Sequence, residues 1–272
     1  MSKKIKNRKR NFFMFQRKYL CIPYALFLIL FVIIPILIIV VYAFTDDKGI
    51  SFNAFINFFT TPSKLNVLFV SLFIALQTTI ICLLIGYPLA YFLADKKVNK
   101  NAVLVTLFIA PMWINFVLRT WATRDVLSAM GINGGDYPYT ATLIGMVQNY
   151  LPFVILPLYT TMLKLDKSQI EAAADLGANP SQVFFKSILP QTIPGIISAC
   201  LMTFMPTMSS YVISDIFSEG KITIFGKFIE LEFDNSLWHD GSFMALIMLV
   251  IIGLTMFLTK NNDKEEKRGQ NL

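Results

Sequence analysis

The side chains that most often carry out covalent or metal chemistry are few in this sequence. Cys21, Cys82 and Cys200 lie far apart within apolar runs, and His239 is the single histidine. Zinc sites and hydrolytic triads require clustered ligands or a nucleophile beside a base, and the sequence contains no C-x-x-C, no G-x-S-x-G and no phosphate-binding G-x-x-x-x-G-K-[ST] motif. It therefore predicts that this chain holds no metal, binds no cofactor and is not an enzyme. Any ATP that it uses is expected to be hydrolysed by a partner.

A polar segment at residues 165–190 carries the strongest local signals. Its sequence is LDKSQIEAAADLGANPSQVFFKSILP. Ser168 followed three residues later by Glu171 has the spacing of a capping box, and the alanines that come next favour helix strongly. Gly177 is placed to end such a helix in the left-handed conformation. We therefore expect a short helix over about residues 168–178.

A second helix is predicted directly after the first. Asn179 is typical of a helix N-cap, and Pro180 is typical of the first helical residue. Such caps would hold the first helix rigidly, and its small side chains would let the backbone of another protein approach closely. Glu171 and Asp175, four residues apart, leave one polar edge. The pattern predicts a docking helix; a well-capped connector without a partner is the alternative.

The elements that must position this helix are predicted to be membrane spans. The chain has 272 residues, of which 55% are hydrophobic and only 15% charged, and its mean hydropathy is +0.59. A soluble domain is about one quarter charged, so the composition excludes a soluble globular domain and a disordered chain. Crossing a bilayer takes about 20 apolar residues in a helix. Six segments without Asp, Glu, Lys, Arg or His approach or exceed this length: 19–44, 66–94, 102–118, 141–163, 188–214 and 242–259.

The distribution of charge predicts how these spans are oriented. If the N-terminus is cytoplasmic, the inner segments carry 18 of the 24 Lys and Arg residues, and the outer loops carry ten of the 17 acids. Membrane proteins place basic residues inside. We therefore expect an all-α polytopic membrane protein with six transmembrane helices and both termini in the cytoplasm. Its regions are a basic N-terminus (1–18), a span domain (19–259) and a tail (260–272). The basic N-terminus is predicted to lie against membrane lipid and to have no role in binding nucleic acid.

Prolines and polar side chains occur within the expected spans. A proline removes a backbone N–H and kinks its helix, and the freed carbonyl must be satisfied by protein or by water. These residues favour a cavity between helices; hydrogen bonding that simply holds a bundle together is the alternative. Proton- or ion-coupled carriers usually place ionisable residues in the membrane. Their absence from the expected spans argues against such a carrier and favours coupling to a soluble motor.

The segment at 165–190 resembles the EAA signature of ABC importer permeases, EAA---G---------I-LP. The matching residues are Glu171, Ala172, Ala173, Gly177, Leu189 and Pro190. The expected Ile falls on Ser187, next to Ile188. Residues 110–122 (APMWINFVLRTWA), 148–178 and 205–217 (MPTMSSYVISDIF) extend the likeness over most of the chain. They make the sequence similar to spermidine/putrescine importer permeases of the PotB type.

This resemblance implies a fold, a location and a set of partners. The fold would be that of a type I (MetI-like) ABC importer permease in the inner membrane of a bacterium, where the chain forms half of a polyamine pathway. Its partners would be a pair of ATPase subunits that use ATP, a second, similar permease and an extracellular polyamine-binding protein. The EAA helix would dock on the ATPase. The residues implied in docking are Glu171, Ala172, Ala173, Asp175 and Gly177.

A polyamine is a flexible polycation, so its pathway should offer carboxylates and aromatic faces to the amines. Trp113 and Tyr211 lie beside prolines near the outer ends of expected spans, and Asp215 follows the fifth span, so these three are predicted pathway residues. An interfacial aromatic belt and a solvated loop are the alternatives. Arg119 would repel a polycation, and we expect it to pair with an acid or to face lipid headgroups. Because no expected span contains a carboxylate, the partner permease should supply much of the charge recognition.

Two other functions remain compatible with the sequence. One is an ABC permease for another solute, such as ferric ion, phosphate, sulfate or an amino acid, because the binding protein largely sets specificity. The acidic outer face disfavours the anions among these. The other is a stand-alone carrier or channel, which would need no ATPase. The sequence does not predict a preference for spermidine or putrescine.

Overall fold

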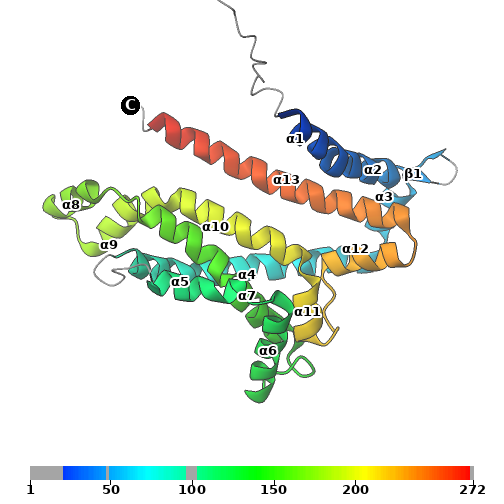
Figure 1. Ribbon diagram of the computed structural model, residues 1–272, viewed down its shortest axis with the longest axis horizontal. Helices are drawn as coiled ribbons and strands as arrows, with labels where there is room; N and C mark the ends of the chain where they lie inside the picture. Colours follow the sequence, from blue (N-terminus) through cyan, green and yellow to red (C-terminus); the bar gives the residue numbers. More distant parts are fainter. Residues whose placement is uncertain (1–20, 47–48, 96–102, 270–272) are drawn as a thin grey trace, which may run out of the picture.

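The computed structural model describes residues 21–46, 49–95 and 103–269. Within these residues the protein is helical, apart from a two-stranded antiparallel hairpin of β1 (Thr45–Asp46) and β2 (Gly49–Ile50). Figure 1 shows the long helices lying along one axis, with short helices gathered at both ends. The predicted all-α class is therefore confirmed.

Within the described residues, five helical segments are long and apolar enough to cross a membrane. They are Ile22–Ala43, Pro62–Ala94, Pro138–Met162, Pro180–Ser209 and Trp238–Phe257. The first contains α1 (Cys21–Leu28), a π-helical turn (Ile29–Ile33) and α2 (Ile34–Ala43). The second and third are α4 (Pro62–Ala94) and α7 (Pro138–Met162), and the fourth contains α9 (Pro180–Val183), a π-helical turn (Phe184–Ile188) and α10 (Leu189–Ser209). The last belongs to α13 (Trp238–Gly269).

All of these segments except the first begin earlier than the sequence predicts. α4 starts at Pro62 and α13 at Trp238, each four residues before the expected boundary. Proline at the first helical position is compatible with this start because its missing N–H needs no partner there. The earlier starts bring Lys64, His239 and Asp240 into the first turns, so the expectation that the spans lack ionisable residues is wrong at their outer ends.

The prediction of one continuous span at 102–118 is also wrong. The chain forms α5 (Val103–Ile109) with a short 3₁₀ turn to Trp113, and then bends by 99° into α6 (Phe116–Ala129). Pro111 lies in the 3₁₀ turn. The side chain of Asn115 accepts hydrogen bonds from the backbone N–H groups of the second and third residues of α6, at 3.0 and 3.2 Å. This N-cap starts a new helix in the middle of an apolar run, so the part of the chain that the structure describes has five candidate spans and one bent pair.

The short helices lie at the ends of the bundle. They are α3 (Asn53–Thr60), α8 (Lys167–Asp175), α11 (Tyr211–Ser218) and α12 (Phe225–Asp234). α8, α9 and the C-terminal part of α13 lie toward the left-hand end in Figure 1, whereas β1, α3 and α12 lie at the other. Among the described residues, the hairpin of α8 and α9 and the C-terminal part of α13 thus lie toward the same end of the bundle, as expected.

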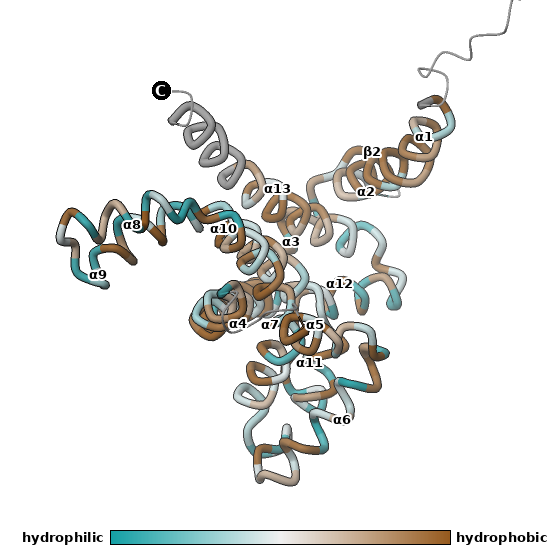
Figure 2. Tube along the Cα trace, turned by 60° about the vertical axis from the view of Figure 1, so that its left-hand side comes forward, coloured by the Kyte–Doolittle hydropathy of each residue, from teal (hydrophilic) through white to brown (hydrophobic). Residues whose placement is uncertain are grey.

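The centre of the bundle is the packing of α4, α7 and α10. Its buried side chains include Ile74 and Cys82 from α4, Met146 and Val154 from α7, and Ala199 from α10. A second cluster joins α2, α3, α12 and α13 at the end opposite α8, and it includes Ala43, Phe58, Phe225, Phe243 and Met244. Many large apolar side chains on α2 and α4 are exposed, and Figure 2 shows the tubes of these two helices largely brown. Such surfaces suit a lipid environment.

Glycines allow the closest approaches between these helices. A Cβ atom at Gly145 of α7 would lie 2.3 Å from the ring of Phe217, which is fully buried on α11. A Cβ atom at Gly195 of α10 would lie 2.6 Å from the hydroxyl oxygen of Thr161. Small residues at helix contacts are typical of membrane bundles. The contact at Gly145 fixes the position of α11, which carries two of the predicted pathway residues.

Replacing Gly145 by alanine is expected to lower the free energy of unfolding by about 1–3 kcal/mol, the usual cost of overpacking a core. The matched control is Gly253→Ala on α13, where a Cβ atom would meet nothing within 4 Å. That variant should be neutral or slightly stabilising, because alanine is the better helix former. Thermal unfolding of both variants in detergent would check this expectation. Equal melting temperatures would show that α11 is not held by this contact.

Candidate functional site

The cytoplasmic helix predicted at 168–178 is α8, but its N-cap differs from the expected one. Asp166 is the cap: its carboxylate accepts hydrogen bonds from the backbone N–H of Ser168, at 3.0 Å, and from the Ser168 hydroxyl, at 2.6 Å. The hydroxyl bond holds the pKa of Asp166 below its usual value. The predicted capping box of Ser168 and Glu171 is therefore wrong, because an acid two residues earlier takes its place.

The end of α8 agrees with the prediction. Gly177 has a φ of +82°, the left-handed conformation that favours glycine, and its N–H donates to the carbonyl of Ala174 at 2.9 Å. Asn179 then caps α9, and its side chain forms a reciprocal capping box with Gln182. Pro180 is the first residue of α9, as expected. The sharp reversal thus comes entirely from local signals.

The predicted docking residues lie together on the surface of this hairpin. The exposed members are Glu171, Ala172, Asp175 and Gly177, while Ala173 is half-buried. Sequence reasoning missed Leu176, which is 89% exposed at the end of α8. The signal available was a large apolar residue immediately before the glycine that ends the helix. The side chain of Leu176 is therefore accessible to another protein.

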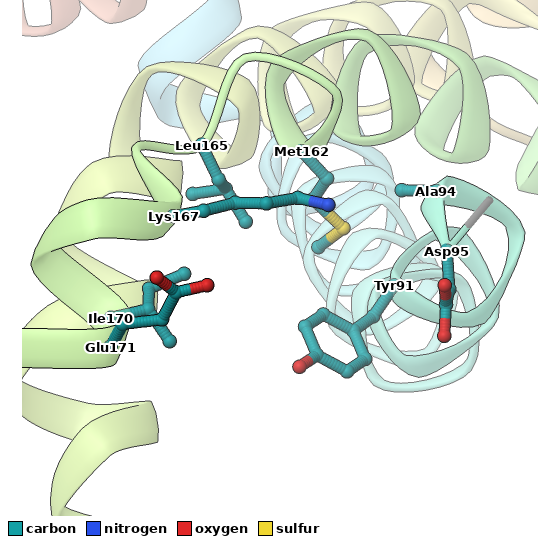
Figure 3. Close-up of a pocket in the computed structure, with 8 residues that line it drawn as sticks. All are labelled: Tyr91, Ala94, Asp95, Met162, Leu165, Lys167, Ile170 and Glu171. Carbon is teal, nitrogen blue, oxygen red and sulfur yellow. The ribbon is translucent and has the colours of Figure 1, made fainter. Parts of the chain in front are cut away.

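One side of α8 faces a recess at the end of α4. A cavity of about 320 Å³ lies there. Its lining residues are Tyr91, Ala94, Asp95, Met162, Leu165, Lys167, Ile170 and Glu171. Figure 3 shows Lys167 and Glu171 on the α8 side and Tyr91 and Asp95 on the opposite side. The polar groups of this recess are two carboxylates, one phenol and one lysine, and they lie beside four apolar side chains.

A hydrogen-bonded link joins α8 to the fifth expected span. The backbone N–H of Asp166 donates to the side-chain oxygen of Gln191 in α10, at 2.9 Å. The amide nitrogen of Gln191 donates in turn to the carbonyl of Ser187, at 3.1 Å. The start of α8 is therefore attached directly to the start of α10.

At the outer end, two of the three predicted pathway residues come together around a lysine. The ammonium of Lys227 on α12 lies 3.5 Å from a carboxylate oxygen of Asp215, 2.9 Å from Glu230 and 5.1 Å from the ring centroid of Tyr211. We call these four residues the outer cluster. Sequence reasoning missed Lys227 and Glu230, because they lie on a different helix from Tyr211 and Asp215. Trp113 is not in the outer cluster; it is 78% exposed in the turn between α5 and α6.

The charges of the outer cluster influence one another. The negative charge of Glu230, together with a hydrogen bond between Glu230 and the phenol, raises the pKa of Tyr211. The hydrogen bond to Glu230 and the charge of Asp215 raise the pKa of Lys227. Tyr211 is therefore neutral and Lys227 charged near pH 7. The cluster offers two carboxylates and an aromatic face to one ammonium group.

Arg119 does not behave as the sequence predicts. Its guanidinium donates to the carbonyl of Pro111 at 2.8 Å and to the side-chain oxygen of Asn149 at 2.6 Å. Asn149 is buried and donates to the carbonyl of Gly145. Among the described residues no acid pairs with Arg119, so the expected pairing with an acid is wrong. The arginine instead connects α7 with the turn that lies between α5 and α6. It also lines a cavity of about 300 Å³.

A buried ionic group lies nearer the outer surface. The ammonium of Lys64 on α4 lies 3.3 Å from Glu232 on α12 and 2.9 Å from Asp240 on α13. We call these three residues the buried triad; their side chains are 7%, 8% and 17% exposed. The side chain of Asn57 on α3 also donates to Asp240, at 2.6 Å. The triad joins α4, α12 and α13, and Asn57 adds α3 to the group. Within the described residues no cluster of His, Cys, Asp and Glu could hold a metal ion.

Comparison with known proteins gives relatives over most of the chain. It is 36% identical over 253 residues to the spermidine/putrescine transport system permease protein PotB of Haemophilus influenzae, a match that covers 85% of this chain and 88% of the relative. It is 34% identical over 254 residues to PotB of Escherichia coli, covering 85% and 92%. A PotB homolog of Mycoplasma genitalium is 27% identical over 270 residues, covering 90% and 91%. No protein-family model matches the chain.

A solved structure has a similar fold. It is a bacterial ABC transporter involved in the import of the acidic polysaccharide alginate, and one of its chains superposes with a TM-score of 0.63. The match covers 95% of this chain and 99% of that chain at 14% identity. The likeness at this identity concerns the fold alone.

Proposed function

The chain belongs to the PotB family of spermidine/putrescine permeases, and we propose on this basis that it is the transmembrane permease subunit of an ATP-driven polyamine importer. The observation that carries the proposal is the identity of about one third to PotB proteins over 85% of the chain. We propose further that it has the type I, MetI-like fold, with both termini in the cytoplasm and the bent pair of α5 and α6 as its sixth membrane element.

The exposed hairpin of α8 and α9 supports a docking role toward an ATPase. In this proposal Glu171, Ala172, Ala173, Asp175 and Gly177 contact one subunit of an ATPase dimer. Leu176 adds an apolar contact that burial would stabilise. ATP is bound and hydrolysed by those partners, because this chain has no phosphate-binding loop. The link from Asp166 to Gln191 would transmit a displacement of α8 to α10.

Two further partners complete the proposed importer. A second, similar permease forms the other half of the pathway, and an extracellular polyamine-binding protein delivers the substrate to the outer loops. Tyr211 and Asp215 supply an aromatic face and a carboxylate to an amine, and Trp113 faces outward from the bent pair. Closure of the ATPases draws the two docking helices together, and the spans then open outward; hydrolysis returns them to the inward-open state.

The experiment that tests this function is uptake of labelled spermidine and putrescine by cells that lack the permease and by the same cells with it restored. Loss and recovery of uptake is the expected result. Unchanged polyamine uptake would refute polyamine transport while leaving a docking role for α8 intact. Co-purification of an ATPase subunit with the tagged permease is expected as well, and its absence would favour a stand-alone carrier.

A further inference from the structure

The geometry of the outer cluster points to a binding site for a primary ammonium group that Lys227 occupies when no substrate is present. This inference rests on the proposed function and deepens it. In this inference Glu230, Tyr211 and Asp215 bind one amine of the polyamine. The side chain of Lys227 competes with that amine for the same site.

The chemistry of Lys227 supports the assignment. A lysine side chain is a four-carbon stem that ends in an ammonium group, and one end of a polyamine is likewise a methylene chain ending in an ammonium group. The groups that hold Lys227 are two carboxylates and the face of a tyrosine ring, at 2.9, 3.5 and 5.1 Å. These are the groups that stabilise an alkylammonium ion in a protein. A site that fits one such group fits the other.

The exposure of the outer cluster makes Lys227 displaceable. The side chains of Lys227, Asp215 and Glu230 are 26%, 35% and 35% exposed, so solvent and ligand reach all three. An ion pair at this exposure contributes little to stability, because solvent screens the charges. The two carboxylates outnumber the lysine, so the cluster keeps a net negative charge that attracts a second cation. An incoming ammonium ion can therefore replace the lysine without leaving a carboxylate unpaired.

The fold holds this cluster where a substrate would arrive. Gly226, next to Lys227, allows α12 to lie against the end of α10: a Cβ atom there would be 2.7 Å from the backbone oxygen of Ser209. Tyr211 begins α11 only two residues after the end of α10. The hydroxyl of Tyr150 on α7 hydrogen-bonds to Ser210 between them. The cluster thus lies on α11 and α12, which adjoin the end of α10 that is remote from α8 and α9 (Figure 1).

The test is direct binding of labelled spermidine and putrescine to the whole transporter in nanodiscs, without the binding protein, at low salt. Lys227→Met keeps the length of the stem and removes the charge, and it should bind polyamine roughly three- to tenfold more tightly. Lys227→Arg keeps the charge and should bind like the unmodified protein. The matched control is Lys221→Met, because Lys221 lies on the same outer segment but donates to the carbonyl of Gly135.

Equal affinity for Lys227→Met and Lys221→Met would overturn the inference, because loss of any outer positive charge would then explain the change. Adding Asp215→Asn to Lys227→Met should remove the gain, and a gain that persists would also overturn it. Lys227→Gln is a second neutral variant in case the first does not assemble. If the unmodified transporter imports polyamine but none of these variants changes binding, the inference alone fails. If it neither binds nor imports polyamine, the proposed function fails as well.

Discussion

Replacing Glu171 by arginine is expected to abolish polyamine uptake while the permease still reaches the membrane. Glu171 is exposed on α8. Two of the predicted docking residues are acids, and of these Glu171 lines the recess at the end of α4 (Figure 3), whereas Asp175 does not. An opposite charge at an interface built for a carboxylate costs several kcal/mol, which corresponds to a loss of about 100-fold or more in association. Uptake of labelled polyamine and co-purification of the ATPase should fall together.

The matched control is Ser181→Arg on the neighbouring α9. Ser181 is exposed, is not one of the predicted docking residues and does not line the recess. This variant should keep most of its uptake, and immunoblots of membrane fractions should show equal amounts of both proteins. Normal uptake by Glu171→Arg would refute the docking assignment.

Replacing Lys64 by methionine is expected to destabilise the protein by about 3–5 kcal/mol, the typical cost of removing one partner from a buried ionic group. Lys64 is the positive charge between Glu232 and Asp240, and its removal leaves both carboxylates buried without a cation. One oxygen of Glu232 already has no hydrogen-bond partner among the described residues. Thermal unfolding in detergent should show a large decrease in melting temperature.

Two further variants make this prediction specific. Lys221→Met removes a charge from the exposed outer surface and should leave the melting temperature close to that of the unmodified protein. Lys64→Met combined with Glu232→Gln and Asp240→Asn should recover most of the loss, because the uncompensated charges are then gone. A triple variant as unstable as Lys64→Met would mean that shape, and not charge, explains the effect.

Local signals were sufficient to predict the hairpin of α8 and α9. Gly177 needs no distant contact to adopt its left-handed conformation, and Asn179 and Pro180 act on the backbone next to them. The predicted N-cap differs from the observed one by two residues, because Asp166 and Ser168 are both residue types that cap helices well. Only the folded chain shows that Asp166 accepts a backbone N–H of the first turn. Five spans were located for a similar reason: hydropathy is a property of a continuous segment.

The remaining features depend on residues that meet only in three dimensions. The break between α5 and α6 lies in a uniformly apolar run, so hydropathy does not detect it, although Pro111 and Asn115 are each capable of ending or starting a helix. The partner of Arg119 is Asn149, thirty residues away on another helix. The outer cluster likewise joins α11 to α12, and a pattern along either helix contains only half of it.

The continuity of one helical run has a mechanical consequence. Pro180–Ser209 is a single run of 30 residues, and at 1.5 Å per residue it measures about 45 Å. At one end the link between Asp166 and Gln191 attaches it to α8, and at the other Ser209 lies directly against Gly226. The run is therefore a lever whose two arms end at the docking hairpin and at the outer cluster. In the proposed importer, a tilt imposed on the inner arm would move the outer arm in the opposite direction, so a displacement of the docking hairpin would change the spacing between the residues of the outer cluster.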